Sequence, residues 1–202
     1  MKTVSILSAL FGLTLAQYDT YSAPFRLVLS SDDPTLNNTA LGACHEGAAV
    51  EGLCKTNQTT SDPPTFYTTF YQATSSNSGS TYDTPSILYY NLTISSGTQI
   101  PSAMRFSQDY TSDVAIPLFM PGNSTYTPVY VDQDCEELYI PRRVDDSVSP
   151  PNPLAPPEKV KSWYVCLTKE AYEYYTLVWH VGGRGSPANP SCEEVQVRRV
   201  FT

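Results

Sequence analysis

Short runs in which apolar and polar positions alternate recur along the whole chain. A period of two places successive side chains on opposite faces of a β-strand, so each run predicts a half-buried strand. The runs are Phe25–Ser30, Phe66–Gln72, Ile87–Ser95, Ala103–Phe106, Val114–Phe119, Val129–Val131, Leu138–Ile140, Trp163–Thr168, Leu177–Val181 and Val195–Arg198. Many short strands with turn-rich links predict an all-β fold, an antiparallel β-sandwich or barrel-like domain with little helix.

The last three runs lead to the most specific structural prediction. The period of two places Trp163 and Trp179 together in one core, with Cys166 on the opposite face. We expect adjacent antiparallel strands at the centre of the fold from Trp163–Leu167, Leu177–Val181 and Val195–Phe201.

A proline-rich segment precedes these three runs. Residues 149–157 read Ser-Pro-Pro-Asn-Pro-Leu-Ala-Pro-Pro. Because proline fixes φ near the polyproline II value and cannot donate to a strand ladder, we expect a stiff surface loop here.

The first sixteen residues have the three parts of a secretory signal peptide. Lys2 supplies a positive charge, an apolar run extends from Val4 to Leu15, and small residues precede an expected cleavage point after Ala16. The apolar run is shorter than the roughly 20 residues that a transmembrane helix needs. We therefore expect a signal peptide at 1–16 and a single secreted β-rich domain at 17–202. The expected location is extracellular or cell-wall associated, with no membrane span.

The chain is acidic, with 20 Asp and Glu against 12 Lys and Arg and a formal net charge of −8. Such a surface repels phosphate backbones, which excludes nucleic acid as an expected partner and disfavours anionic membranes. Charged residues make up only 16% of the chain, whereas tyrosine occurs 15 times. Tyrosine suits half-buried strands whose side chains end in water.

Five cysteines follow the signal peptide: Cys44, Cys54, Cys135, Cys166 and Cys192. In an oxidising compartment they are expected to form disulfides, and five cysteines allow several arrangements of two bonds and one free thiol. Local spacing favours Cys44–Cys54 and Cys166–Cys192, with Cys135 free. No C-x-x-C pair is present and the two histidines lie far apart, so no metal site is expected. No cofactor is expected either.

Four Asn-x-Ser/Thr sequons follow the signal peptide, starting at Asn37, Asn57, Asn91 and Asn123. Behind a signal peptide they predict an N-glycosylated protein. Asn91 lies inside an expected strand, so a glycan at this position requires that its side chain face outward.

Four segments resemble a known family: Leu36–Cys54, Val114–Phe119, Trp163–Cys166 and Asn189–Cys192. In this order they are similar to a family of secreted, cysteine-containing proteins of filamentous ascomycete fungi, of unknown function. The resemblance implies a fungal, secreted, β-rich protein and implies no activity. It also implies that Cys135 lies outside the shared cysteine pattern, which supports a free thiol there.

The sequence offers weak candidates for catalysis. His45 beside Glu46 has the composition of a general base and its carboxylate, but the second histidine of H-E-x-x-H is absent. We expect both residues to stabilise the Cys44–Cys54 segment, and we assign no catalytic residue.

Acidic pairs leave a glycosidase open as an alternative. Such enzymes need two carboxyl groups that face each other across the substrate, whereas neighbours on a strand point to opposite faces. Asp132, Asp134 and Glu136 also alternate, but a solvated turn is favoured over a calcium site. The pairs are Glu46 with Glu51, Asp132 with Asp134, and Asp145 with Asp146.

Exposed aromatic side chains can bind sugars by stacking, although aromatic residues in a β-sandwich more often fill its core. Candidate stacking residues are Tyr164, Tyr172, Tyr174 and Tyr175. The leading hypothesis is a non-catalytic extracellular domain that binds a glycan, a wall polymer or a host protein. The alternatives are an uncharacterised secreted hydrolase, such as a glycosidase, and a structural or antigenic wall protein.

Overall fold

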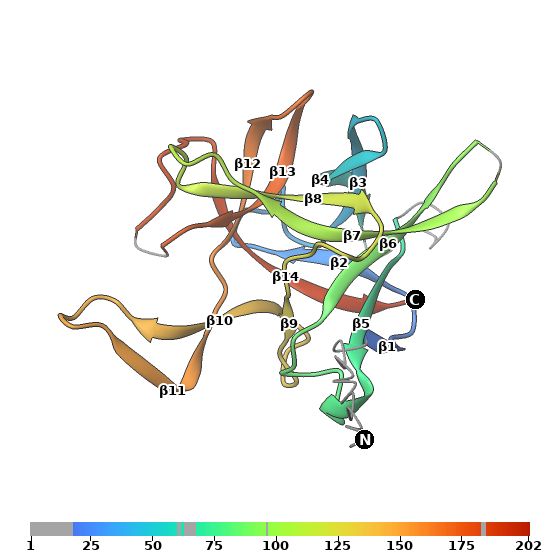
Figure 1. Ribbon diagram of the computed structural model, residues 1–202. Coiled ribbons are helices and arrows are strands. Elements are labelled where there is room, and N and C mark those ends of the chain that lie inside the picture. The colour runs from blue at the N-terminus through green and yellow to red at the C-terminus, as the bar shows by residue number, and fades with distance from the viewer. Residues whose placement is uncertain (1–17, 60–61, 63–67, 96, 183–184) are drawn as a thin grey trace, which may run out of the picture.

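The computed structural model describes residues 18–59, 62, 68–95, 97–182 and 185–202. The expected signal peptide at 1–16 lies outside the described residues, as does the start of the expected strand Phe66–Gln72. The described residues form β1 (Tyr18–Tyr21), β2 (Phe25–Ser30), β3 (Thr39–Gly47), β4 (Val50–Thr59), β5 (Phe70–Ser75), a 3-10 helix η2 (Ser76–Ser78), β6 (Ile87–Thr93), β7 (Gln99–Ser107), β8 (Val114–Pro121), β9 (Tyr130–Val131), β10 (Leu138–Asp145), β11 (Asn152–Val160), β12 (Trp163–Lys169), β13 (Glu173–His180) and β14 (Glu193–Phe201). The all-β prediction is confirmed (Figure 1).

Eleven strands form one antiparallel sheet in the order β1-β5-β6-β7-β8-β13-β12-β14-β2-β3-β4. Additional pairings join β4 to β8 and β13, and β2 to β5. The sheet therefore folds over and closes on itself, which gives the barrel-like arrangement that the sequence predicts. A second sheet, in the order β11-β10-β9, carries the hairpin β10–β11 away from this body as an arm (Figure 1).

The last three strands lie at the centre of the large sheet, as predicted. β12 pairs with β13 along one edge, where Trp163 lies opposite Trp179, and it pairs with β14 along its other edge. The two indole rings lie 4.9 Å apart at their centroids, and Trp163 is fully buried. Trp163 Nε1 also donates to the carbonyl of Leu138 at 2.8 Å, so the buried polar atom has a partner. Trp179 is only half-buried at the edge of this core.

Two disulfides join the cysteine pairs that the sequence favours. Cys44 on β3 forms a disulfide with Cys54 on β4, and their Cα atoms are 5.9 Å apart. Cys166 forms a disulfide with Cys192, and their Cα atoms are 4.1 Å apart. A Cβ atom at Gly52 would lie 3.1 Å from Cys44 Sγ, so the glycine makes room for the first bond. None of the alternating runs in the sequence falls on β3 or β4, yet the two strands pair as a hairpin around this bond.

The proline-rich segment also differs from the expected loop. Residues 152–160 form β11, which pairs with β10 from Ile140↔Val160 to Arg142↔Glu158 and again at Val144↔Pro153. Residues 154–157 lie in the irregularity between these two stretches. Prolines are tolerated here because β11 is an edge strand and the irregular part needs no ladder donors. The segment is exposed, as expected, but most of it is a strand.

Candidate functional site

The strand β6 carries side chains of different kinds on its two faces. Leu88 and Tyr90 point into the main core, whereas Ile87, Tyr89 and Asn91 lie on the outer face of the sheet. On this outer face a small second apolar cluster consists of Ala73, Ile87 and Ala103. These small side chains form the floor of a hollow.

Tyrosine rings surround this floor and enclose a groove of about 220 Å³. The ring of Tyr18, on β1, lies 5.3 Å from that of Tyr126, and the two side chains also hydrogen bond. Tyr21 and Tyr71 both contact Tyr89, at centroid distances of 6.3 and 5.4 Å. We call this hollow the tyrosine groove; its lining is Tyr18, Tyr21, Ala73, Ile87, Tyr89, Asn91, Pro101, Ala103, Gly122 and Asn123.

Asn123 reaches the rim of the groove because the chain turns at Gly122, directly after β8. Gly122 has a φ of 96°, a conformation that glycine adopts without steric cost. Its N–H donates to the carbonyl of Pro101 at 2.8 Å, and its own carbonyl accepts from Ala103 at 3.1 Å. The residues after β8 are therefore fixed along the edge of β7.

The ten described residues that line the groove offer ring faces, phenol hydroxyls and side-chain amides, and none has an acidic or basic side chain. Burial raises the pKa of Tyr18 and of Tyr89 to about 12. The hydrogen bond to Tyr126 contributes to the higher pKa of Tyr18, and the neighbours Tyr21 and Tyr71 contribute at Tyr89. The groove stays uncharged at neutral pH and is suited to stacking and hydrogen bonding.

The wall that β1 provides is fastened at one end to η2, directly after β5, and at the other end to β5 itself. Asp19 accepts hydrogen bonds from the N–H and the hydroxyl of Ser76, at 2.7 and 2.9 Å. After β1, the N–H of Ser22 donates to the carbonyl of Gln72 at 2.9 Å, and its Oγ accepts from the Gln72 N–H at 3.0 Å. The positions of Tyr18 and Tyr21 therefore follow the position of β5.

A buried arginine on β14 connects β5 to the rest of the molecule. Arg199 is 2% exposed, and its Nε donates to Glu136 Oε2 at 2.9 Å. One of its terminal nitrogens lies 2.8 Å from the same oxygen, and the other donates to Gln72 Oε1. Gln72 in turn donates from Nε2 to the carbonyl of Thr81 at 2.9 Å. One cation thus joins β14, the turn between β9 and β10, and β5.

Aromatic rings and a strained residue complete this anchor. The Arg199 guanidinium lies 4.8 Å from the ring centroid of Tyr82 and 4.7 Å from that of Phe201. Tyr82 donates its hydroxyl to Glu136 Oε1 at 2.5 Å. Glu136 has a φ of 61°, a left-handed backbone conformation that is energetically unfavourable for residues other than glycine. The contacts with Arg199 and Tyr82 hold it there.

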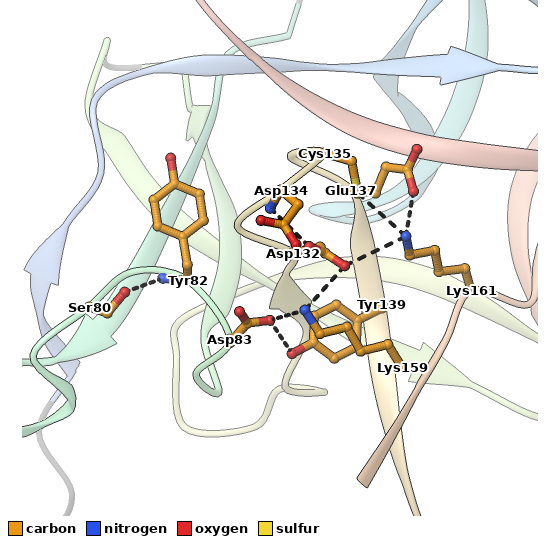
Figure 2. A network of polar contacts seen from close by, with 10 residues as sticks. All are labelled: Ser80, Tyr82, Asp83, Asp132, Asp134, Cys135, Glu137, Tyr139, Lys159 and Lys161. Carbon is orange, nitrogen blue, oxygen red and sulfur yellow. Dashed lines mark hydrogen bonds and ion pairs between the residues drawn. The ribbon is translucent and has the colours of Figure 1, made fainter. Parts of the chain in front are cut away.

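Next to this anchor lies a second polar network, which Figure 2 shows. Asp132 is buried and lies 3.2 Å from Lys159 Nζ, which also pairs with Asp83 at 2.7 Å. Lys161 pairs with Glu137 at 2.6 Å. A backbone N–H in the turn, two residues after Asp132, donates to the Asp132 carboxylate. This hydrogen bond and the two lysines lower the pKa of Asp132. The network fastens the β9–β10 turn to the end of β11 and to Lys161, which follows it.

Of the carboxylates considered for calcium, those of Asp132 and Glu136 have cationic protein partners, Lys159 and Arg199. Among the residues that the structure describes, no group of three or more His, Cys, Asp or Glu side chains is placed to hold a metal ion.

Cys135 lies in the same turn and is an exposed free thiol. Its Sγ is 3.4 Å from Lys161 Nζ (Figure 2). Desolvation by the surrounding protein raises the pKa of the Cys135 thiol above its ordinary value. The thiol is therefore mostly protonated at neutral pH, which lowers its nucleophilicity.

The residues considered for catalysis make contacts within the fold. Glu46 Oε2 accepts the backbone N–H groups of Ala171 and Tyr172, both at 3.1 Å, and so fastens the β12–β13 turn to β3. His45 Nδ1 lies 3.5 Å from Glu51 Oε1 on the neighbouring strand. Glu46 is thus occupied by backbone donors, whereas Glu51 pairs with the imidazole.

The structure separates the tyrosines that the sequence proposes for stacking. Tyr164 is buried, with 8% of its surface exposed, and fills the core cluster around Cys166. Tyr172 and Tyr174 lie 6.4 Å apart at the β12–β13 turn, and Tyr175 lines a separate shallow hollow. Tyr164 therefore has no free face for a ligand.

The tyrosines of the groove were not singled out from the sequence. Their local signal was the run Ile87–Ser95, whose period of two places Tyr89 and Asn91 on one face. Tyr18, Tyr21 and Tyr126 come from distant segments, so only the sheet pairing reveals them.

The four sequon asparagines differ in their surroundings. Asn37 and Asn57 are exposed, on the turn before β3 and on β4. Asn91 and Asn123 both line the tyrosine groove. The side chain of Asn91 lies on the outer face of β6, as a glycan there requires.

A model for a family described as a domain of unknown function, DUF7907, matches residues 22–201. The chain belongs to this family. The match covers β2 to β14, and β1 with its two groove tyrosines precedes it. No curated protein and no solved structure matches the chain. No helix in the described part of this DUF7907 chain is long and apolar enough to cross a membrane.

The Arg199 anchor leads to a stability prediction. Arg199→Met keeps an apolar stem of similar length but leaves Glu136 and Gln72 without their buried partner. We expect a loss of about 3–5 kcal/mol in the free energy of unfolding, the usual cost of removing one partner of a buried pair. Urea unfolding measures it. Arg198→Met, at the neighbouring exposed position of β14, is the control, and an equal loss in both variants would contradict the anchor.

The raised tyrosine pKa values lead to a pH prediction. Because Tyr18 and Tyr89 have pKa values of about 12 in the folded chain and about 10 when unfolded, folding favours the protonated phenols. Their contribution to stability is complete below about pH 10 and is lost as the pH rises through about 12. Urea midpoints over this range should fall less steeply in the double variant Tyr18→Phe/Tyr89→Phe. Equal slopes in both proteins would show that these phenols are not protected.

Proposed function

We propose that the chain is a secreted glycoprotein whose DUF7907 domain binds carbohydrate without catalysis, with the tyrosine groove as its binding site. The observation that carries the proposal is a groove walled by tyrosine rings with two asparagine side chains at its rim. Apolar C–H faces of a sugar stack on aromatic rings, and its hydroxyls bond to amides and phenols. At about 220 Å³ the groove suits one sugar ring or a chain end rather than a large ligand.

The rings are held in place before a ligand arrives. The ring of Tyr89 contacts those of Tyr21 and Tyr71, and the ring of Tyr18 contacts that of Tyr126. Side chains that are already ordered lose little entropy on binding, which favours affinity. The tyrosine groove therefore meets a requirement for recognition that a freely rotating surface tyrosine does not.

Secretion and glycosylation belong to the same proposal. Two disulfides fit an oxidising compartment, and the first sixteen residues have the pattern of a signal peptide. The four sequon asparagines are exposed or half-exposed in the structure. With the resemblance to secreted fungal proteins, these features favour a polysaccharide of the fungal wall or of a host surface as the ligand.

An acidic hollow offers less support for the glycosidase alternative. It measures about 450 Å³ and lies between β2 and β14, where Asp32, Asp33, Glu193 and Glu194 line it. Asp33 accepts the N–H of Thr35 at 2.8 Å, which lowers its pKa. A carboxyl group with a lowered pKa is a poor general acid, and the described lining contains no aromatic ring on which a sugar stacks.

A binding experiment tests the proposal. The full chain, produced with its disulfides in a host that adds no glycans, is titrated with soluble chitin, β-glucan and mannan oligosaccharides. We expect one of them to bind, and Tyr89→Ala to weaken binding at least ten-fold, about 1.4 kcal/mol, because the variant removes the central ring. Tyr172→Ala at the β12–β13 turn is the matched control and should bind as the parent does. Absence of binding to all three, or an equal loss in both variants, would contradict the proposal.

A further inference from the structure

Two of the four sequons start at residues that line one and the same groove. Asn91 lies on β6 and Asn123 follows β8, yet both side chains reach the rim of the tyrosine groove. The other two, Asn37 and Asn57, lie elsewhere on the surface. A glycan attached at the groove would begin beside the rings that we propose as the sugar site.

We propose that the N-linked glycan on Asn91 folds back into the tyrosine groove, so that its first sugars stack on Tyr89 and external carbohydrate must displace them. The inference rests on the proposed function, because it requires that the groove accept sugar rings. It adds a form of regulation, since the glycan on Asn91 lowers the affinity of the groove for other ligands.

The register of β6 places the attachment atom beside the ring. Asn91 follows Tyr89 by two residues, so the two side chains share the outer face, and their Cα atoms are about 7 Å apart at the usual rise of a strand. Across the ladders, Tyr71 lies opposite Tyr89, and Pro101 lies opposite Asn91. The first sugar on Asn91 Nδ2 therefore starts within reach of two stacked rings.

Because the glycan is covalently attached beside the groove, even a weak affinity of its sugars for the groove is enough to occupy it. A sugar that is tethered beside its site has an effective concentration in the millimolar range, so a millimolar dissociation constant already fills much of the site. Stacking removes ring surface and sugar C–H groups from water, which supplies this preference. A free oligosaccharide then competes with an occupant that never diffuses away.

Enzymatic trimming of the glycans tests whether the glycan lies in the groove. The native protein, secreted from a yeast that adds high-mannose glycans, is treated with an endoglycosidase that cuts between the first two sugars, and each site is followed by peptide mass spectrometry. We expect trimming at Asn91 to be at least ten-fold slower than at Asn57. Tyr89→Ala should raise the rate at Asn91 to that at Asn57 and leave Asn57 unchanged.

An Asn91 site that is trimmed as fast as Asn57, that is insensitive to Tyr89→Ala, or that carries no glycan would overturn the inference. The glycan on Asn57 is the matched control because this residue is exposed on β4 and does not line the groove.

A binding comparison separates this inference from the proposed function. Thr93→Ala removes the sequon and keeps the Asn91 side chain, and it should raise the affinity for oligosaccharide about five-fold or more. Asn57→Gln should not change it. Slow trimming at Asn91 with no oligosaccharide binding even by Thr93→Ala would refute the binding of external carbohydrate and support the glycan in the groove. Equal affinity in the parent and in Thr93→Ala, together with fast trimming at Asn91, would refute the placement of the glycan in the groove. The proposed function would be unaffected.

Discussion

The arrangement of the molecule depends on one buried cation, the guanidinium of Arg199. A charge removed from water needs nearby opposite charge and hydrogen bonds, because its desolvation costs several kcal/mol. Glu136 supplies the charge from the β9–β10 turn, and Gln72 supplies a carbonyl oxygen from β5. The backbone of Gln72 also hydrogen bonds to Ser22, directly after β1. The ion pair therefore fixes the position of β5, and the position of β5 in turn fixes that of the β1 tyrosines.

The outer face of β5, β6 and β7 explains why tyrosine gathers there. The inner face is buried in the main core, while the outer face presents Ala73, Ile87 and Ala103. Such a floor would be an exposed apolar patch, and tyrosine rings cover it. The packing that protects the floor also creates a groove with aromatic walls, so stability and binding draw on the same side chains.

The sequence predicted those parts of the fold that local patterns determine. Alternation was sufficient to predict the central strands β12, β13 and β14 and the shared core of Trp163 and Trp179, because a period of two is readable within each strand. The hairpin β3–β4 was missed since glycine, alanine and cysteine occupy positions where large alternating residues would signal a strand. The groove was missed because its walls meet only through the pairing of β1 with β5 and the path after β8.

The central claim is that carbohydrate binds on the outer face of β6. Amide chemical shifts of the full, unglycosylated chain, followed while the best-binding oligosaccharide is added, test it most directly. The account predicts shifts that saturate together at residues 87–91, 102–103 and 122–123, around the lining of the groove. Shifts confined to residues 170–175 at the β12–β13 turn, or to the acidic hollow at residues 30–33 and 193–196, would contradict it.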